Sequence, residues 1–199
     1  VQTITEVVAD TLEVQRASIW HLSEDKNELI CKDLFDKVEN KHTSGNKIDT
    51  KLFPSYFNAI LTETRICAND AQNDPRTSEL AESYLIPMNI KSMLDAGIVV
   101  NGKLVGVVCC EHVGIERMWY NDEESFLSTI SSLIAQMYIN KERLNTETAL
   151  LKAQAHLGSI FKASPAGIGL TKNRIITEIN DFFCTLTGYS RDEIIAQNA

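Results

Sequence analysis

The chain has 199 residues, of which 44% are hydrophobic and 23% charged, as in an ordinary soluble globular protein. Its formal net charge of −8 argues against nucleic acid or an anionic membrane surface as the main partner. No apolar run approaches the roughly 20 residues that span a bilayer, and the N-terminus lacks the pattern of a signal peptide. The five cysteines, an odd number placed mostly in apolar patterns, favour a reducing, cytoplasmic location.

The first 90 residues predict an α+β arrangement, because helical and alternating apolar patterns occupy separate stretches. Clusters of polar residues, proline and glycine separate these stretches. In chain order we expect a helix that starts at Val1, strands at 17–22 and 28–35, a polar segment at 36–49, a helix that starts at Pro54, a strand at 65–68, a loop at 69–76 and a short helix at 77–85.

The strongest local signal is a β-hairpin between Ser92 and His112. Asn101-Gly102 separates two apolar runs, and both residues tolerate the positive φ of a type I′ turn. A two-residue loop fixes the register and predicts that Gly97 and Gly106 lie opposite each other as a bare patch. Because both faces are mostly apolar, these should be central strands covered on both sides. The predicted faces are Leu94, Ala96, Ile98, Val100, Val105, Val107 and Cys109 on one side, and Met93, Asp95, Gly97, Val99, Leu104, Gly106, Val108, Cys110 and His112 on the other.

A long helix is expected from Asp122 to about Lys162, with Asn121 as its N-cap and acidic residues in its first turn. Its apolar residues recur alternately every four and three positions, which is the heptad of a coiled coil. We therefore predict a homodimer through this helix, in which a buried Asn140 fixes register and oligomer state. The alternative is a helix that packs on its own sheet, at least as far as Met137. The predicted seam is Phe126, Ile130, Leu133, Met137, Asn140, Leu144, Glu147 and Leu151.

The order of these elements resembles the GAF domain. The resemblance is sharpest in the segments A-N-D-A-Q-N-D-P-R-T, I-K-S-M-L-D-A-G-I, N-G-K-L-V-G-V-V-C-C-E-H and W-Y-N-D-E-E, which lie between residues 68 and 124. They are similar to GAF domains of bacterial sensor kinases and related signalling proteins. The resemblance implies an antiparallel sheet with helices on both faces, and a pocket between the sheet and residues 36–90.

A second resemblance lies downstream. The segment N-D-F-F-C-T-L-T-G-Y-S-R-D-E-I-I, at 180–195, resembles the N-terminal part of a PAS domain. Asn180 is expected to cap a short helix that ends at Gly188, and Ser190 with Glu193 forms a capping box for the next helix. We expect a GAF domain at 1–140, a linker helix at 141–159 and an incomplete PAS α/β segment at 160–199.

Candidate ligand-binding residues come from the implied pocket. A buried Asp95 needs a hydrogen-bond donor, so it either anchors a ligand or bonds a loop backbone. The predicted register places Cys110 on the same face as Asp95. The aromatic residues at 54–85 either line a pocket or belong to an ordinary core. The candidates are Asp95, Cys110, Tyr56, Phe57 and Tyr84.

The sequence identifies no cofactor. The cyclic-nucleotide branch of the GAF family carries an N-K…F…D-E pattern, whereas Asn101 and Lys103 are separated by Gly102 in a predicted turn. Bilin attachment requires a neighbouring Cys–His pair, which is not found here. Cys110 and His112 share a strand face, but further metal ligands are not evident.

The PAS-like segment likewise carries no flavin or haem signature. In flavin-binding photoreceptors of that family a reactive cysteine follows the G-Y-S helix, and Ala199 stands at the corresponding position here.

No catalytic residue is predicted, since the phosphate-binding loop, G-x-S-x-G and H-E-x-x-H motifs are missing. His156 lacks the residues that surround a phospho-accepting histidine, and adjacent Cys109 and Cys110 would form a strained disulfide. The sequence favours the sensory module of a cytoplasmic bacterial signalling protein, with a histidine kinase as output and a diguanylate cyclase or phosphodiesterase as alternatives. A ligand-free dimerisation scaffold and an enzyme related to methionine-sulfoxide reductases are hypotheses from other classes.

Overall fold

A computed structural model of the protein describes residues 1–197. The chain divides at Asn140 into two compact units, the first being Val1–Asn140 and the second beginning at Lys141. Over residues 1–197, no helix combines the length and the apolar character needed to cross a bilayer. The two units are described separately below.

The first unit is built on an antiparallel sheet with the strand order β3-β2-β1-β7-β6-β5, and β4 also pairs with β2. The hairpin of β6 and β7 therefore lies inside the sheet, as its two apolar faces predicted. The strands are β1 (Arg16–Leu22), β2 (Glu28–Asp36), β3 (Lys41–Thr43), β4 (Lys47–Asp49), β5 (Arg65–Ala68), β6 (Ile90–Val100) and β7 (Lys103–Val113).

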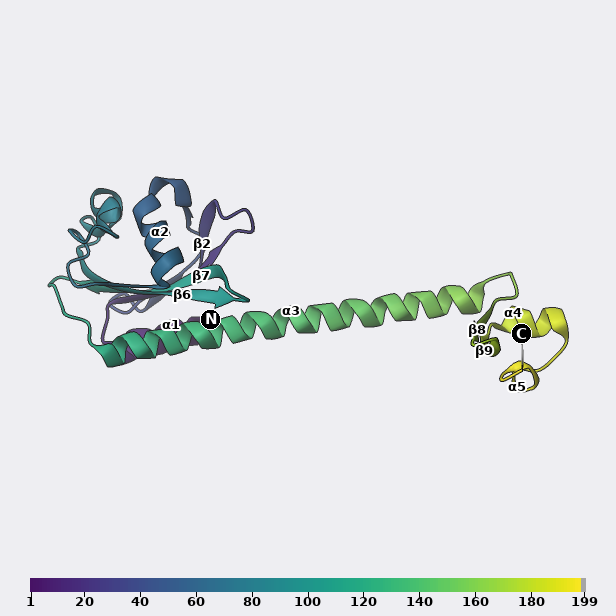
Figure 1. The fold of residues 1–199 in the computed structure, drawn as a ribbon. Coiled ribbons are helices and arrows are strands. Elements are labelled where there is room, and N and C mark those ends of the chain that lie inside the picture. The colour runs from purple at the N-terminus through teal and green to yellow at the C-terminus, as the bar shows by residue number, and fades with distance from the viewer. Residues whose placement is uncertain (198–199) are drawn as a thin grey trace. The chain divides into compact units, whose positions relative to one another are not determined.

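Helices cover both faces of this sheet (Figure 1). One face carries α1 (Gln2–Thr11) and the first part of the 43-residue helix α3 (Asn121–Ala163). The other carries α2 (Pro54–Glu63) and the short helices η2 (Ser78–Leu80) and η3 (Ala81–Leu85), with η1 (Thr50–Leu52) just before α2. Pro54 suits the first turn of α2, where its missing N–H costs nothing, and Thr64 ends the helix in the left-handed region at φ 58°.

Two apolar cores result, one on each face. Trp20, Ile60 and Val107 belong to the core between the sheet and α2. Leu94 and Leu127 belong to the core between the sheet, α1 and α3. Burial of each such side chain contributes about 1.5–3 kcal/mol, so the two cores together hold both helical layers against the sheet.

The hairpin turn forms as predicted, with φ of 51° at Asn101 and 74° at Gly102. The register beyond it differs from the prediction, because Val99 pairs with Leu104 but Ile98 pairs with Gly106. Val105 is thus an extra residue in β7, which makes a β-bulge next to the turn.

The bulge reverses the predicted sidedness of β7 relative to β6. Gly97 lies opposite Val107 and not opposite Gly106, so the predicted bare patch of two facing glycines is wrong. Asp95 lies opposite Cys109, on the face toward α2, whereas Cys110 belongs to the core under α1 and α3. The predicted pairing of Asp95 and Cys110 on one face was wrong for the same reason.

Other elements agree with the sequence, with two exceptions. The strand at 65–68 has the predicted bounds as β5, and the expected short helix at 77–85 is divided into η2 and η3. The polar segment at 36–49 contains the short strands β3 and β4. They were not predicted because their three residues each are mostly polar and exposed, without an apolar alternation.

The second unit contains the end of α3, followed by β8 (Gly169–Lys172), β9 (Ile175–Ile179), α4 (Asp181–Thr187) and α5 (Arg191–Ile194). β8 and β9 pair antiparallel. The predicted caps are confirmed: the Asn180 side chain accepts a hydrogen bond from the Phe183 N–H, Gly188 follows α4 at φ 77°, and Ser190 and Glu193 form the capping box. Ala199, compared above with a photoactive cysteine, lies outside the described residues.

One testable consequence concerns Gly106 in the middle of β7. A Cβ at this position would overlap the carbonyl oxygen of Trp20 on the paired strand β1. We therefore expect Gly106→Ala to lower the free energy of unfolding in urea by about 1–3 kcal/mol, the usual cost of overpacking. Gly158→Ala is the control, because a Cβ there meets no atom within 4 Å and alanine favours a helix. Equal effects of the two changes would contradict the close approach.

Candidate functional site

A small cavity lies between the sheet and the segment that carries α2 and η3. Its volume is about 40 Å³, and most of its lining is aromatic or aliphatic. A void of this size holds two or three waters, whereas pockets for small molecules usually measure about 300–1,000 Å³. A larger ligand therefore enters only if α2 or η3 moves away from the sheet. The side chains used below are Trp20, Tyr56, Phe57, Tyr84, Cys109 and Glu111.

The structure brings together some of the predicted ligand-binding residues. Tyr56, Phe57 and Tyr84 line the cavity. Asp95 lies behind Tyr56 and is completely buried, and Cys110 lies on the opposite face of the sheet. The cavity thus keeps the three aromatic candidates and excludes Cys110.

Sequence reasoning missed two polar lining residues, Cys109 and Glu111. Both are on β7 and two positions apart, so they share a strand face. The sequence showed that Cys109 and Glu111 share a strand face. It did not show that this face is the one of Asp95, because the bulge at Val105 reverses β7 relative to β6. Arg16, which pairs with Glu111, was also missed, because nothing near it in sequence marks a buried ion pair.

Asp95, Tyr56 and Cys109 form a buried polar cluster at the wall of the cavity. The Tyr56 hydroxyl donates to Oδ2 of Asp95 at 2.7 Å, and the Cys109 Sγ lies 3.8 Å from the same hydroxyl. Burial raises the pKa of Asp95 to about 7, although the hydrogen bond from Tyr56 opposes the change. Burial also raises the pKa of the Cys109 thiol well above its usual value, so this thiol stays protonated and unreactive.

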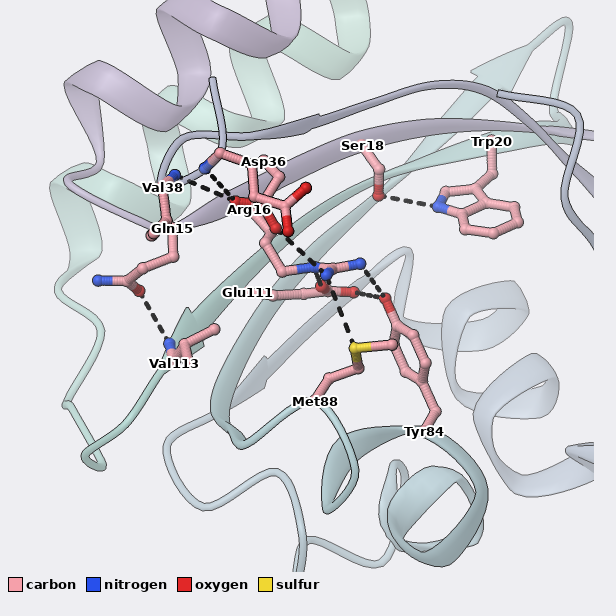
Figure 2. A network of polar contacts seen from close by, with 11 residues as sticks. Gln15, Arg16, Ser18, Trp20, Asp36, Val38, Tyr84, Met88, Glu111 and Val113 are labelled. Carbon is pink, nitrogen blue, oxygen red and sulfur yellow. Dashed lines mark hydrogen bonds and ion pairs between the residues drawn. The ribbon is translucent and has the colours of Figure 1, made fainter. Parts of the chain in front are cut away.

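A second polar network ties the covering segment to the sheet (Figure 2). The Glu111 carboxylate accepts a hydrogen bond from Arg16 Nε at 2.8 Å and another from the Tyr84 hydroxyl at 2.7 Å. Arg16 also reaches the Asp36 carboxylate at 3.5 Å. Burial raises the pKa of Glu111, while the Arg16 guanidinium opposes that rise and favours the ionised form. Because Tyr84 belongs to η3, this network holds η3 over the cavity.

The chemistry of the cavity limits what it can bind. Both Glu111 oxygens and the Arg16 guanidinium already have partners, so an incoming phosphate or carboxylate meets no free cation among the lining residues. The aromatic walls suit an uncharged or weakly polar molecule. Among residues 1–197, no group of three or more histidine, cysteine or acidic side chains is placed to hold a metal ion.

The comparison with family models decides the identity of the first unit. The model of the GAF domain matches residues 1–137. The chain belongs to the GAF domain family.

Solved structures support the same fold. The PixJ GAF domain from Thermosynechococcus elongatus, in its blue-light absorbing form, is 13% identical, with a TM-score of 0.59 and coverage of 72% of this chain and 88% of that one. Residues 122 to 287 of a methyl-accepting chemotaxis protein are 15% identical, with a TM-score of 0.60 and coverage of 71% and 87%. A domain assigned to a two-component sensor histidine kinase protein from Sinorhizobium meliloti is 16% identical, with a TM-score of 0.53 and coverage of 74% and 92%. A search of curated proteins finds no significant match.

In this GAF domain Asn101 and Lys103, which were compared with the cyclic-nucleotide pattern, lie at the hairpin turn, and the acidic pair Asp122-Glu123, taken for the D-E of that pattern, lies at a helix start. Asn101 forms the hairpin turn and Lys103 starts β7. Asp122 and Glu123 lie in the first turn of α3, and Glu123 pairs there with Arg117. None of these four side chains lines the cavity between the sheet and α2.

Asp95 gives a prediction about pH. Its pKa rises from 3.8 to about 7 on folding, so its contribution to stability is fully present below pH 3.8 and is lost as the pH rises to about 7. This loss is on the order of 4 kcal/mol. Because asparagine does not ionise, the free energy of unfolding of Asp95→Asn should fall much less between pH 4 and 7 than that of the unmodified chain.

Urea denaturation at several pH values measures this difference. Glu39→Gln, which removes an exposed carboxylate, is the control and should follow the unmodified chain. Parallel pH curves for Asp95→Asn and the unmodified chain would refute the raised pKa.

Proposed function

We propose that this GAF domain is the sensory module of a cytoplasmic bacterial signal-transduction protein. In this proposal a small molecule or partner alters the packing around the cavity, and α3 carries the change to a PAS domain and an output domain. A histidine kinase is the favoured output, with a diguanylate cyclase or phosphodiesterase as alternatives. We assign no catalytic role to this chain.

The observation that carries the proposal is the division of α3 into two faces. Leu127, Ser131, Ile134 and Ala135 are buried against the sheet. The predicted heptad lies on another face, where Leu133, Met137, Leu144 and Leu151 are 53–62% exposed. Phe126 and Ile130 are partly buried against the sheet, so the intramolecular alternative applies to them and not to Met137.

An exposed apolar heptad favours a second copy of the same helix as its partner. Heptad spacing allows two helices to supercoil with the side chains of one packed between those of the other. Asn140 and Glu147 lie within the same row, and a polar residue there selects register at a cost in affinity. We therefore propose a parallel homodimer, in which a shift of α3 in one GAF domain changes the packing of the two paired helices along their length.

The second unit supports a PAS assignment through its local structure. A hairpin, β8 and β9, leads to α4, whose N-cap is Asn180, and α5 follows with its capping box. The apolar side chains Leu170 and Leu186 are 49% and 69% exposed, as expected for a domain whose core needs further chain to cover it. We propose that residues 160–199 are the beginning of that PAS domain.

A ligand-free dimerisation scaffold is the second candidate function. The cavity volume of about 40 Å³ favours it, because the walls already fill the space that a ligand would occupy. A reductase based on cysteine chemistry is disfavoured, since burial raises the pKa of both Cys109 and Cys110 far above that of a reactive thiol.

The dimer proposal predicts a sharp difference between two adjacent leucines of α3. Leu151 belongs to the heptad and Leu150 does not, yet they are 61% and 58% exposed. Leu151→Asn should weaken self-association by about tenfold, since a buried leucine contact contributes at least ~1.4 kcal/mol. Leu150→Asn, the matched control, should leave it unchanged, and Asn140→Leu should strengthen it. Sedimentation equilibrium measures all three, and equal effects of the two Asn substitutions would rule out this seam.

Native mass spectrometry separates the sensor from the scaffold. For the sensor we expect a dimer that carries an additional small-molecule mass when the chain is purified from bacterial cells. A dimer without added mass supports the scaffold. Both the sensor and the scaffold require a dimer through α3. A chain that stays monomeric even at concentrations 100 times above those used in sedimentation would contradict both.

A further inference from the structure

The end of α2 and the face of α3 meet at one residue of the sheet. Strand β5 pairs with β6 only as far as Ala96, so the next residue, Gly97, has no strand beside it on that edge. Its N–H donates to the carbonyl oxygen of Thr64, at the end of α2, at 2.8 Å. Its carbonyl oxygen accepts a hydrogen bond from the Ser131 hydroxyl of α3 at 3.0 Å. The backbone of Gly97 therefore connects helices that cover opposite faces of the sheet.

The absence of a side chain at Gly97 is what permits this approach. A Cβ there would lie 2.8 Å from Cδ1 of Leu104 and 3.3 Å from the Thr64 oxygen. Thr64 in turn adopts a left-handed conformation, which ends α2 and turns its carbonyl toward the sheet. The hydrogen bond between Gly97 and Thr64 thus requires both a residue without Cβ at Gly97 and a left-handed backbone at Thr64.

A second contact with α3 comes from the corner Thr64–Arg65, where the chain turns from the end of α2 into β5. Arg65, next to Thr64, places Nε 3.1 Å from the Glu124 carboxylate and a terminal nitrogen 3.5 Å from the Ser128 hydroxyl. Glu124, Ser128 and Ser131 are four and three residues apart, so they lie on one face of α3. The corner Thr64–Arg65 therefore holds one face of α3 at two levels, directly through Arg65 and through the backbone of Gly97.

The same helix α2 is a wall of the cavity. Tyr56 and Phe57 line the cavity from α2, and Ile60, one turn further on, lies beside Gly97. Because the cavity admits only a few waters, a larger ligand displaces η3 or α2, and in the second case the C-terminal end of α2 moves with it. Such a displacement moves the corner at its end, and hydrogen bonds are directional, whereas the apolar contacts of Leu127 and Ile134 tolerate sliding.

We propose that the corner Thr64–Arg65, together with the Gly97 backbone, is the mechanical coupling through which the cavity wall controls the position of α3. This regulatory role rests on the sensory function proposed above. It assigns positioning roles to Arg65 and Ser131, neither of which touches the cavity. Coupling requires an element that both sites bias, and α2 with its corner is that element.

Hydrogen exchange followed by mass spectrometry tests the coupling in the full chain without any ligand. Phe57→Leu loosens the cavity wall without touching the corner. We expect it to accelerate exchange in 54–63 and, by about fivefold, in 124–135, the change that loss of one typical hydrogen bond produces. In the Arg65→Gln/Ser131→Ala background, Phe57→Leu should still accelerate 54–63 but leave 124–135 unchanged.

The control background is Ser132→Ala/Arg143→Gln. Ser132 bonds only the Ser128 carbonyl within α3, and Arg143 is exposed, so α3 should respond to Phe57→Leu as in the unmodified chain. The proposal is overturned if α3 responds equally with and without the Arg65 and Ser131 contacts, or does not respond at all. Should the double substitution prevent folding, each single substitution is expected to halve the response, and full responses in both would overturn the proposal.

The experiment is carried out on dilute protein, below the concentration at which chains associate. Its outcome is therefore independent of the dimer seam and of any bound molecule. Failure of the coupling leaves the sensory function open to another route, whereas failure of the association or mass measurements leaves the coupling intact.

Discussion

Strands β6 and β7 are covered on both faces, and this constraint organises the rest of the domain. Most side chains of the hairpin, apart from those next to its turn, must fit either the core under α2 or the core under α1 and α3. A strand covered on both faces has no solvent-exposed side for residues that do not fit a core, so its register decides the composition of both cores. The extra residue Val105 sets that register, and with it the choice of Cys109 rather than Cys110 as a neighbour of the cavity.

The same double coverage explains the electrostatics of the cavity face. Two buried carboxylates, Asp95 and Glu111, lie there with one half-buried cation, Arg16. Glu111 takes the cation and the Tyr84 hydroxyl, which leaves Asp95 with Tyr56 as its donor. A second buried negative charge without a cation is costly, and the pKa of Asp95 rises so that this cost is reduced by proton uptake. The cavity is therefore less acidic than its composition implies.

The sequence predicted those parts of the fold that depend on local chemistry. The Asn101-Gly102 turn, strand β5 and the caps at Asn180 and Ser190 follow from backbone preferences of a few adjacent residues. The helix α3 begins at Asn121, so the prediction of Asn121 as its N-cap was wrong by one residue. The bulge was not predictable in this way, because both faces of the hairpin are apolar and a one-residue shift leaves the pattern equally acceptable.

The candidate site likewise contains some residues that local sequence predicts and others that it does not. The aromatic residues of α2 and η3 were found, since an apolar helix over a sheet must face inward. Glu111 and Arg16 were not, because they come from strands far apart in sequence and their pairing appears only when β1 lies beside β7. The heptad behind the proposed dimer seam was visible in the sequence, but the exposure of Leu133 and Met137 depends on which face of α3 packs against the sheet.

The small volume of the cavity also has a consequence for timing. If a ligand must wait for α2 to move, its association is limited by how often the domain opens, and its apparent affinity is reduced by the fraction of open molecules. Departure is limited in the same way, because a closed wall of aromatic side chains retains the molecule until the next opening. A receptor of this kind responds to the average concentration of its ligand over many openings and is insensitive to brief fluctuations.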